Sequence, residues 1–165
     1  MKLYFLRHAT ATDIAPSDAE RELTNEGREE AHTAGVALAA LGAKPAQVFT
    51  SPLVRARETA RIVAKDLRFN GEIVVLDELK PGKTTSSVLR ELKSYEDAGD
   101  LLLTGHMPSL AEHVGVLIGA ERIESLALGK GGIACVELEH LRAGQGQLRW
   151  LMRQAQLRQI AERKA

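Results

Sequence analysis

Two arginines and two histidines follow segments of the chain that have the character of buried strands. Arg7 and His8 come directly after the first apolar run, Arg55 lies shortly after the second, and His106 follows a leucine-rich run later in the chain. Arginine offers a fixed fork of donors that fits phosphate or carboxylate oxygens. Histidine can act as a nucleophile or as a proton carrier near neutral pH. These residue types together favour the binding of a dianion and its attack by an imidazole.

Short apolar runs alternate with longer segments of helical periodicity along the chain. Strands are predicted over residues 3–6, 47–50, 72–76, 100–104, 133–138 and 147–152. Helices are predicted from Thr24 to Gly42, from Ser51 to about Leu67, and over residues 85–95, 109–118 and 154–164. This alternation predicts the α/β class, as a three-layer α/β/α domain with a mostly parallel sheet. The last two strands, joined by a turn that contains glycine, are expected to form an antiparallel hairpin.

The parallel sheet gives the four residues a common location. The carboxyl ends of parallel strands lie at one edge of a sheet, which is where ligands bind in such folds. Ser51 and Pro52 predict a helix start, with Ser51 as the capping hydroxyl, and the amides of that helix would point to the same edge. A helix N-terminus favours negative charge. We therefore expect Arg7, His8 and their partners to form a pocket for a phosphoryl group.

Composition limits the class of protein. The 165 residues carry 22 basic and 22 acidic side chains, which gives no case for general attraction to nucleic acid or to a membrane surface. The single cysteine, Cys135, excludes an intramolecular disulfide and a multi-cysteine zinc site, and its apolar surroundings favour an inert buried thiol. Arg7 interrupts the apolar start, so we expect no signal peptide and a cytoplasmic protein. Residues 1–165 are expected to form one domain.

Several blocks of the sequence resemble one family. The triplet Arg7-His8-Ala9 resembles the Arg-His-Gly motif of the histidine phosphatase superfamily, which includes the phosphoglycerate mutases. The segment 50–60 is similar to the second block of that family, and residues 105–108 are similar to its second histidine block. The short chain and the segment 17–27 resemble the small SixA-type phosphohistidine phosphatases. The resemblance implies a phosphoglycerate mutase-like fold over the whole chain.

The resemblance also implies roles for the residues at the sheet edge. His8 would attack phosphorus and carry the phosphoryl group until water releases it. Arg7 and Arg55 would hold the phosphoryl oxygens, and His106 would contact the same oxygens as a cation or as a donor. Arg21, in the loop at the mouth of the site, is predicted to contact substrate. Neither a metal nor a cofactor is expected, because no further histidine or carboxylate lies at ligand spacing from the two histidines.

Two departures from the family pattern bear on the substrate. Ala9 replaces the usual glycine, which is tolerated unless the backbone there needs a positive φ. Larger members carry a carboxylic acid, after the third strand, that protonates an alcohol leaving group. Here that region offers only Asp77 and Glu78, each of which could serve or could be a solvated loop carboxylate. A phosphorylated imidazole needs less help in leaving, so we expect phosphohistidine on a protein as the substrate.

The expected partner is thus a phosphorylated protein, such as a histidine phosphotransfer domain or a phosphocarrier protein, and the enzyme is expected to be a monomer. Two other functions stay open. One is a general small-molecule phosphomonoesterase that uses Asp77 or Glu78 as its acid. The other is a non-catalytic module that binds phosphoproteins, in which His8 would be hard to explain. The remaining histidines, His32, His113 and His140, are predicted to be surface or packing residues.

Overall fold

A six-stranded sheet forms the centre of the computed structural model, which describes residues 1–164. The strands are β1 (Lys2–Arg7), β2 (Gln47–Thr50), β3 (Ile73–Val75), β4 (Leu101–Gly105), β5 (Ile133–Glu137) and β6 (Gln147–Met152), in the order β3-β2-β4-β1-β5-β6. Strands β1 to β4 pair in parallel, while β5 runs antiparallel to both β1 and β6. The predicted mostly parallel sheet with a late antiparallel hairpin is confirmed.

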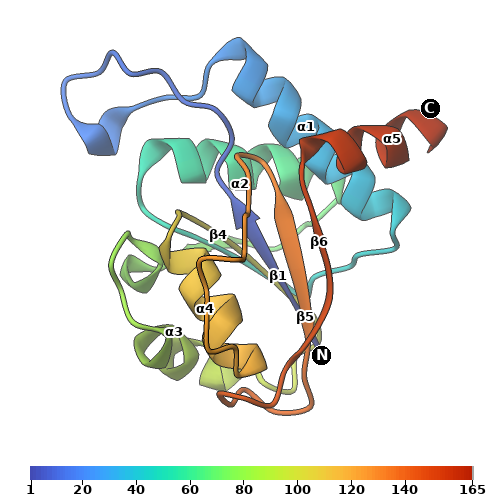
Figure 1. Cartoon of the computed structure of the whole chain (residues 1–165). Coiled ribbons are helices and arrows are strands. Elements are labelled where there is room, and N and C mark those ends of the chain that lie inside the picture. Colours follow the sequence, from blue (N-terminus) through green and yellow to red (C-terminus); the bar gives the residue numbers. More distant parts are fainter. Residues whose placement is uncertain (165) are drawn as a thin grey trace.

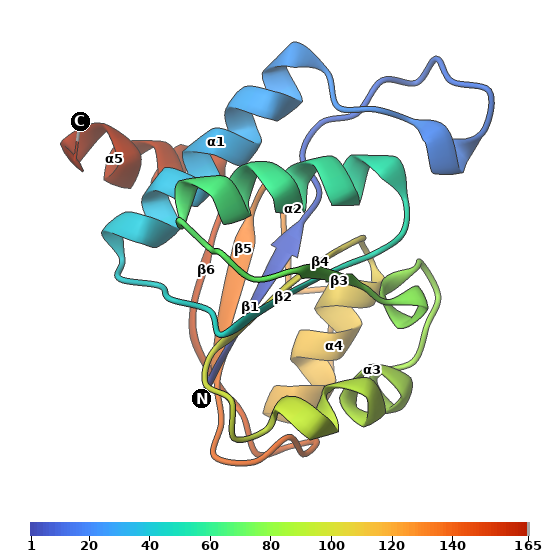
Figure 2. The ribbon, with the colours of Figure 1, turned by 180° about the vertical axis from the view of Figure 1, so that it is seen from behind.

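Helices cover both faces of this sheet. They are α1 (Asn25–Ala40), α2 (Val54–Asp66), α3 (Thr85–Leu92), α4 (Ser109–Ile118) and α5 (Gln154–Lys164). Short 3-10 turns lie at Asp18–Glu20, Asp77–Leu79 and Lys93–Tyr95. Helices α1, α2 and α5 pack on one face, and α3 and α4 pack on the other (Figures 1 and 2). The three-layer α/β/α arrangement is therefore confirmed.

The side chains of β1 alternate between the two layers of core. Leu3 and Phe5 pack with the residues of α3 and α4, whereas Tyr4 and Leu6 pack with those of α1, α2 and α5. Strand β4, next to β1, has no exposed side chain. Burial on both faces is the pattern of a central strand in a parallel sheet. The core thus fixes β1 and β4 side by side, so that their last residues meet at one edge.

Helix α1 holds the loop that leads out of β1. Thr24 caps the helix, since its side chain accepts a hydrogen bond from the Gly27 nitrogen at 3.0 Å. A Cβ atom at Gly27 would lie 1.9 Å from the Thr10 carbonyl oxygen, so only glycine allows this close contact. At the other end Gly42 adopts a φ of +77°, as expected for a residue that follows a helix. The predicted caps of α1 are confirmed.

The predicted start of α2 is wrong. The helix begins at Val54, after Leu53 as N-cap, and no side chain caps it. The Ser51 hydroxyl lies 2.8 Å from Nε2 of His106 instead, because the buried imidazole competes for it. Likewise, the helix predicted over residues 85–95 ends at Leu92 and continues only as a 3-10 turn. In the part of the chain that the structure describes, no helix has the length and apolar character needed to span a membrane.

Candidate active site

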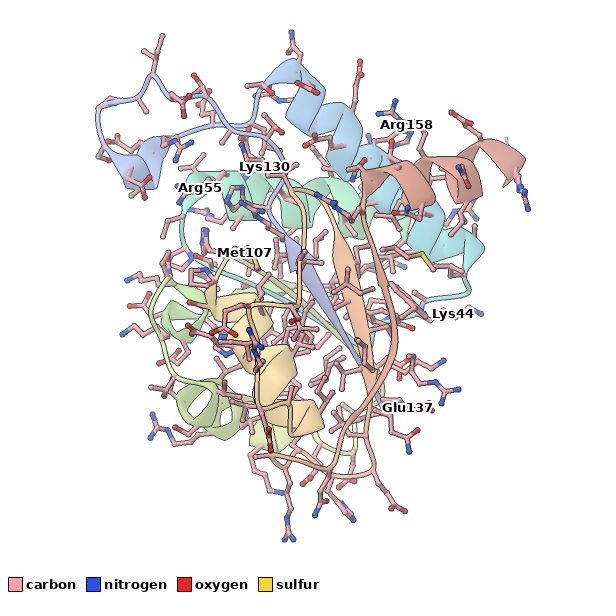
Figure 3. The ribbon with its side chains drawn as sticks, viewed as in Figure 1. Lys44, Arg55, Met107, Lys130, Glu137 and Arg158 are labelled. Atoms are coloured by element: carbon pink, nitrogen blue, oxygen red, sulfur yellow. The ribbon has the colours of Figure 1, made fainter. Side chains whose placement is uncertain are left out.

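The ends of three parallel strands bring the predicted site residues together. Arg7 is the last residue of β1 and pairs with Gly105 at the end of β4. The His8 nitrogen donates to the Gly105 carbonyl at 3.0 Å, and the Ser51 nitrogen, just after β2, donates to the Thr104 carbonyl at 2.9 Å. Figure 3 labels Arg55 and Met107, from α2 and from the segment after β4, at this end of the sheet. The convergence follows directly from the strand order.

His8 is held in one tautomer. Its Nδ1 lies 2.7 Å from the Ala9 carbonyl oxygen, which can only accept, so Nδ1 carries the proton. Nε2 is then unprotonated, and its lone pair accepts a hydrogen bond from the Nε of Arg55 at 3.3 Å. His8 is buried, with 8% of the residue's surface exposed. An unprotonated Nε2 beside a guanidinium is the form that a histidine nucleophile requires.

The backbone around Ala9 is tied to helix α2. The Ala9 nitrogen donates to Oγ1 of Thr59 at 3.1 Å, and that hydroxyl donates to the Arg55 carbonyl at 2.7 Å. Among the described residues, Arg68 is the only one other than glycine with a positive φ. Alanine in place of glycine at position 9 therefore introduces no backbone strain. One hydroxyl thus links the segment that carries His8 to the helix that carries Arg55.

His106 presents an unpartnered ring nitrogen. Its Nε2 is 2.8 Å from the Ser51 hydroxyl, which in turn accepts a bond from the Leu53 nitrogen at 3.4 Å. Where the hydroxyl donates to Nε2, the proton of the neutral ring resides on Nδ1; the same hydroxyl can also accept from Nε2, because its oxygen has two lone pairs. Nδ1 is buried and has no hydrogen-bond partner within the described residues. With its ring centroid 5.1 Å from that of His8, His106 can donate to an oxygen of a bound phosphoryl group.

Both imidazoles are neutral in the unliganded site. Burial lowers the pKa of His8 from 6.5 to about 4, and the charges of Arg55 and Arg7 act in the same direction. Burial lowers the pKa of His106 to about 3, with His8 and Arg55 adding to the effect. Desolvation disfavours the charged form of an imidazole, and so does a nearby cation. Of the two forms predicted for His106, the free site therefore favours the neutral ring over the cation.

Imidazole nitrogen NMR tests this protonation state. Because the pKa of His8 is lowered, the ring should stay neutral, with the proton on Nδ1, from about pH 8 down to about pH 5. Signals are assigned by comparison with His8→Ala and His106→Ala. Conversion of His8 to the imidazolium form between about pH 6 and pH 7, the ordinary range for histidine, would contradict the electrostatics described here.

Arg7 already uses one of its guanidinium nitrogens in a hydrogen bond within the protein. Its Nη1 donates to the Leu128 carbonyl at 3.0 Å, whereas its Nε is buried and lacks a partner among the residues that the structure covers. Burial lowers the pKa of this guanidinium. A buried donor without an acceptor is unfavourable, and an anion in the site could satisfy it. The position of Arg7 therefore fits the role predicted for it, which stays a proposal.

Arg21 contacts the loop at the mouth of the site. Its Nε donates to the Thr12 carbonyl at 2.8 Å, and its terminal nitrogens lie 3.1 Å from Asp13 and 3.2 Å from Asp18. These bonds fold the loop 10–22 back on itself. The structure thus gives Arg21 a role in shaping the loop, and the predicted contact with substrate stays a prediction.

Asp18 is a site residue that the sequence reasoning missed. Its carboxylate lies 3.2 Å from Nη2 of Arg55, and its carbonyl accepts from Nη1 at 2.7 Å. The hydrogen bond from Arg21, with the nearby Arg55, holds the pKa of Asp18 below its usual range. The ionised carboxylate of Asp18 therefore occupies Nη2 of Arg55 and its backbone carbonyl occupies Nη1, so a phosphoryl group must share or displace these contacts. The signal available in the sequence was the position of Asp18 within the SixA-like segment.

The two candidate acids lie in the 3-10 turn after β3. This strand is at the edge of the sheet, separated from β1 by β2 and β4. Asp77 is exposed and lies 2.9 Å from the Lys80 ammonium, and Glu78 is half-buried. Neither carboxylate is among the charges that shift the pKa of His8 or His106, whereas Asp18 is among those that act on His106. The arrangement favours a solvated turn over a positioned acid.

The other histidines lie outside the site. His32 is 2.9 Å from Asp66, and His140 is 3.8 Å from Glu96. His113 is buried against Thr85, and burial lowers its pKa to about 4. The prediction of surface and packing roles is confirmed. Among the residues described, no group of three or more histidine, cysteine or acidic side chains is arranged to hold a metal ion.

Comparisons with known proteins agree with this geometry. Residues 3–85 match the histidine phosphatase superfamily (branch 1). An uncharacterized protein of Picosynechococcus sp. is 35% identical over 81% of this chain and 82% of its own length. The phosphohistidine phosphatase SixA of Escherichia coli is 28% identical over 92% of this chain and 93% of its own.

A solved structure of the protein histidine phosphatase SixA, complexed with tungstate, has a similar fold. It superposes with a TM-score of 0.87, covers 95% of this chain and 99% of its own, and is 27% identical in sequence. The phosphoglycerate mutase-like fold predicted from the sequence is thereby confirmed. Together these matches support a phosphatase. The chain belongs to the histidine phosphatase superfamily, branch 1.

Proposed function

We propose that this protein hydrolyses phosphohistidine on a partner protein through a covalent phosphohistidine at His8. The observation that carries the proposal is the tautomer of His8. Its Nδ1 is committed to the Ala9 carbonyl at 2.7 Å, which leaves the Nε2 lone pair beside Arg55. A module that only binds phosphate has no need of a nucleophilic lone pair there, because another arginine or lysine would bind the anion as well.

The proposed reaction has two steps, both by transfer of a phosphoryl group. In the first, Nε2 of His8 forms a bond to phosphorus as the P–N bond of the substrate breaks, and the leaving imidazole takes up a proton. In the second, water attacks phosphorus, the bond to His8 breaks, and inorganic phosphate is released. Arg7, Arg55 and Nδ1 of His106 would hold the phosphoryl oxygens, whose charge increases in the transition state.

The choice of phosphohistidine rests on the leaving group. An alkoxide leaves slowly unless an acid protonates it, and such an acid contributes roughly 10²–10⁴-fold. Asp18 is kept ionised by Arg21 and Arg55, so it is not suited to give up a proton. Asp77 is exposed and paired with Lys80, and the half-buried Glu78 follows it in the same turn after the edge strand. The imidazole of phosphohistidine leaves with far less help, because its P–N bond is labile and its nitrogen is readily protonated. The similarity to the phosphohistidine phosphatase SixA supports the same substrate class.

The proposed partner is a histidine phosphotransfer domain or a phosphocarrier protein in the cytoplasm, and the enzyme is proposed to act as a monomer without metal or cofactor. Comparison of substrates tests the proposal. A phosphohistidine-containing phosphotransfer protein should react faster than sugar or nucleotide phosphates. Asp77→Asn and Glu78→Gln should leave its rate nearly unchanged, and turnover should survive EDTA.

Two outcomes would contradict parts of this account. If alcohol phosphates react faster and either substitution slows them by roughly 10²–10⁴-fold, the protein is a small-molecule phosphomonoesterase with that residue as its acid. If the wild-type protein binds phosphate but releases nothing from p-nitrophenyl phosphate, whose leaving group needs little protonation, the protein is a binding module.

A further inference from the structure

A basic cavity lies beside the candidate active site. It has a volume of about 510 Å³, and its lining includes Arg7, Lys130, Arg153 and the first residues of α5. Arg7 immediately precedes His8, so the cavity and the proposed phosphoryl site share this residue. Figure 3 labels Lys130 and Arg55 at the same end of the sheet, although they come from distant parts of the chain.

The positive charge of this cavity is not balanced by its own lining. Glu30 is the one carboxylate among the described lining residues, and it accepts hydrogen bonds from the nitrogen and the hydroxyl of Thr10 at 2.8 and 3.1 Å. Within residues 1–164, neither Lys130 nor Arg153 has a carboxylate within 4.0 Å. Both side chains are exposed. The cavity therefore offers two cations to a ligand from solution.

Hydrogen bonds fix the wall of the cavity before any ligand arrives. The Gln154 amide nitrogen donates to the carbonyls of Glu30 and Gly131 at 3.0 and 2.8 Å, and the Gly131 nitrogen donates to the Arg7 carbonyl at 3.1 Å. A Cβ atom at Gly131 would lie 2.5 Å from that amide nitrogen. The start of α5 is thus tied to the end of β1, and a prearranged site loses less entropy on binding.

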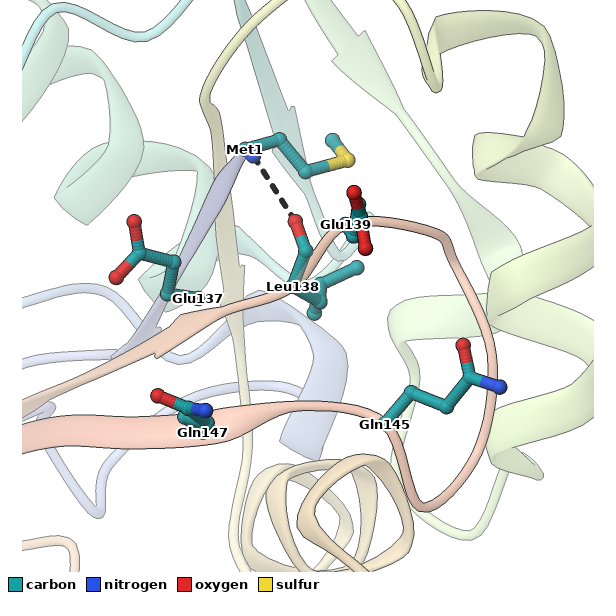
Figure 4. Close-up of a pocket in the computed structure, with 6 residues that line it drawn as sticks. All are labelled: Met1, Glu137, Leu138, Glu139, Gln145 and Gln147. Carbon is teal, nitrogen blue, oxygen red and sulfur yellow. Dashed lines mark hydrogen bonds between the residues drawn. The ribbon is translucent and has the colours of Figure 1, made fainter.

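The charge differs on the opposite side of the site. There a cavity of about 300 Å³ is lined by Asp13 and Asp18 with Arg21. At the other end of the sheet, near Met1, a cavity of about 380 Å³ carries Glu137 and Glu139 (Figure 4). Of these three cavities, only the one beside Arg7 has a net positive lining. A partner protein that presents phosphohistidine to His8 would meet this positive charge on the α5 side.

We propose that Lys130 and Arg153 bind acidic side chains that flank the phosphohistidine of the partner protein. This inference rests on the proposed function, since it names a feature of the same substrate. Exposed ion pairs are individually weak. We therefore expect Lys130 and Arg153 to affect the choice of substrate and the rate of association, and not the rate of phosphoryl transfer. The selectivity should weaken as salt is added, because exposed charges are screened.

Two synthetic peptides test the proposal. Both contain a single histidine, flanked on each side by glutamates in one and by glutamines in the other, and both are phosphorylated on histidine with phosphoramidate. The wild-type enzyme should have the higher kcat/KM for the glutamate peptide. The double variant Lys130→Glu with Arg153→Glu should lower the ratio of the two kcat/KM values by about tenfold, as expected for two reversed contacts at a protein surface.

A matched control separates local contact from total charge. Lys44→Glu with Arg158→Glu changes the net charge by the same amount, and Figure 3 labels both residues away from Arg55 and Lys130. This control should keep the wild-type preference. The inference would be overturned if both double variants lost the preference equally. It would also be overturned if the wild-type enzyme hydrolysed the two peptides at equal rates. In either case the proposed function would stand. Failure of the wild type to hydrolyse either peptide would overturn the proposed function and this inference with it.

Discussion

Replacing His8 by alanine is expected to abolish turnover. The variant lacks the Nε2 lone pair that would attack phosphorus, and among the described residues His8 is the one imidazole to which Arg55 donates a hydrogen bond. Loss of an enzymatic nucleophile lowers kcat by about 10⁴-fold or more. Release of phosphate from a phosphohistidine-containing protein measures the effect, with circular dichroism to establish that the variant is folded.

His140→Ala is the matched control for this variant. His140 is exposed and lies just beyond β5, at the opposite end of the sheet from the site, so its removal should leave kcat within about twofold of the wild type, as is usual for surface substitutions. Activity of His8→Ala comparable to this control would mean that the reaction does not pass through His8. Binding of inorganic phosphate by His8→Ala should persist, because Arg7, Arg55 and His106 remain.

Arg55→Lys is expected to have the next largest effect. Arg55 uses all three of its nitrogens: Nε contacts His8 at 3.3 Å, and the terminal nitrogens contact Asp18 at 2.7 and 3.2 Å. Lysine keeps the charge but has a single ammonium group, which cannot hold two phosphoryl oxygens and His8 together. The loss of one such positioned donor lowers kcat by roughly 10²–10³-fold.

Arg57→Lys controls for the chemistry of the substitution. Arg57 is exposed on the same helix, so the change from arginine to lysine should be nearly silent in kcat and in stability. Near-normal turnover in Arg55→Lys would mean that Arg55 supplies only a general positive field. A large fall in both variants would instead point to a defect in α2 rather than to lost contacts with phosphate.

The arrangement of the site could be predicted from sequence because it depends on topology. Arg7 ends β1, and His8 and His106 directly follow β1 and β4, and parallel strands place their ends at one edge whatever the details of packing. Strands 100–104 and 133–138 were predicted within one residue of the observed β4 and β5 at each end. Apolar runs of this kind can be recognised in the sequence alone, because a strand that is buried on both faces needs apolar side chains along its whole length.

The finer features depend on contacts between distant residues. Ser51 was predicted to cap α2 because its local sequence suits a cap, but His106, from another strand, takes its hydroxyl. Asp18 was missed because the mouth loop has no periodicity that reports which of its acidic residues turns inward. The tautomer of His8 depends on the orientation of the Ala9 carbonyl, which no residue type specifies.

Trapping the phosphorylated enzyme tests whether the reaction passes through a covalent phosphohistidine at His8. The wild-type protein is mixed briefly with a phosphohistidine-containing substrate, quenched in alkali and mapped by mass spectrometry. We expect one phosphoryl group on His8 that is stable in alkali and labile in acid, and none on His8→Ala. A phosphoryl group on any other residue, or complete turnover with no phosphorylated His8 at any quench time, would contradict the account.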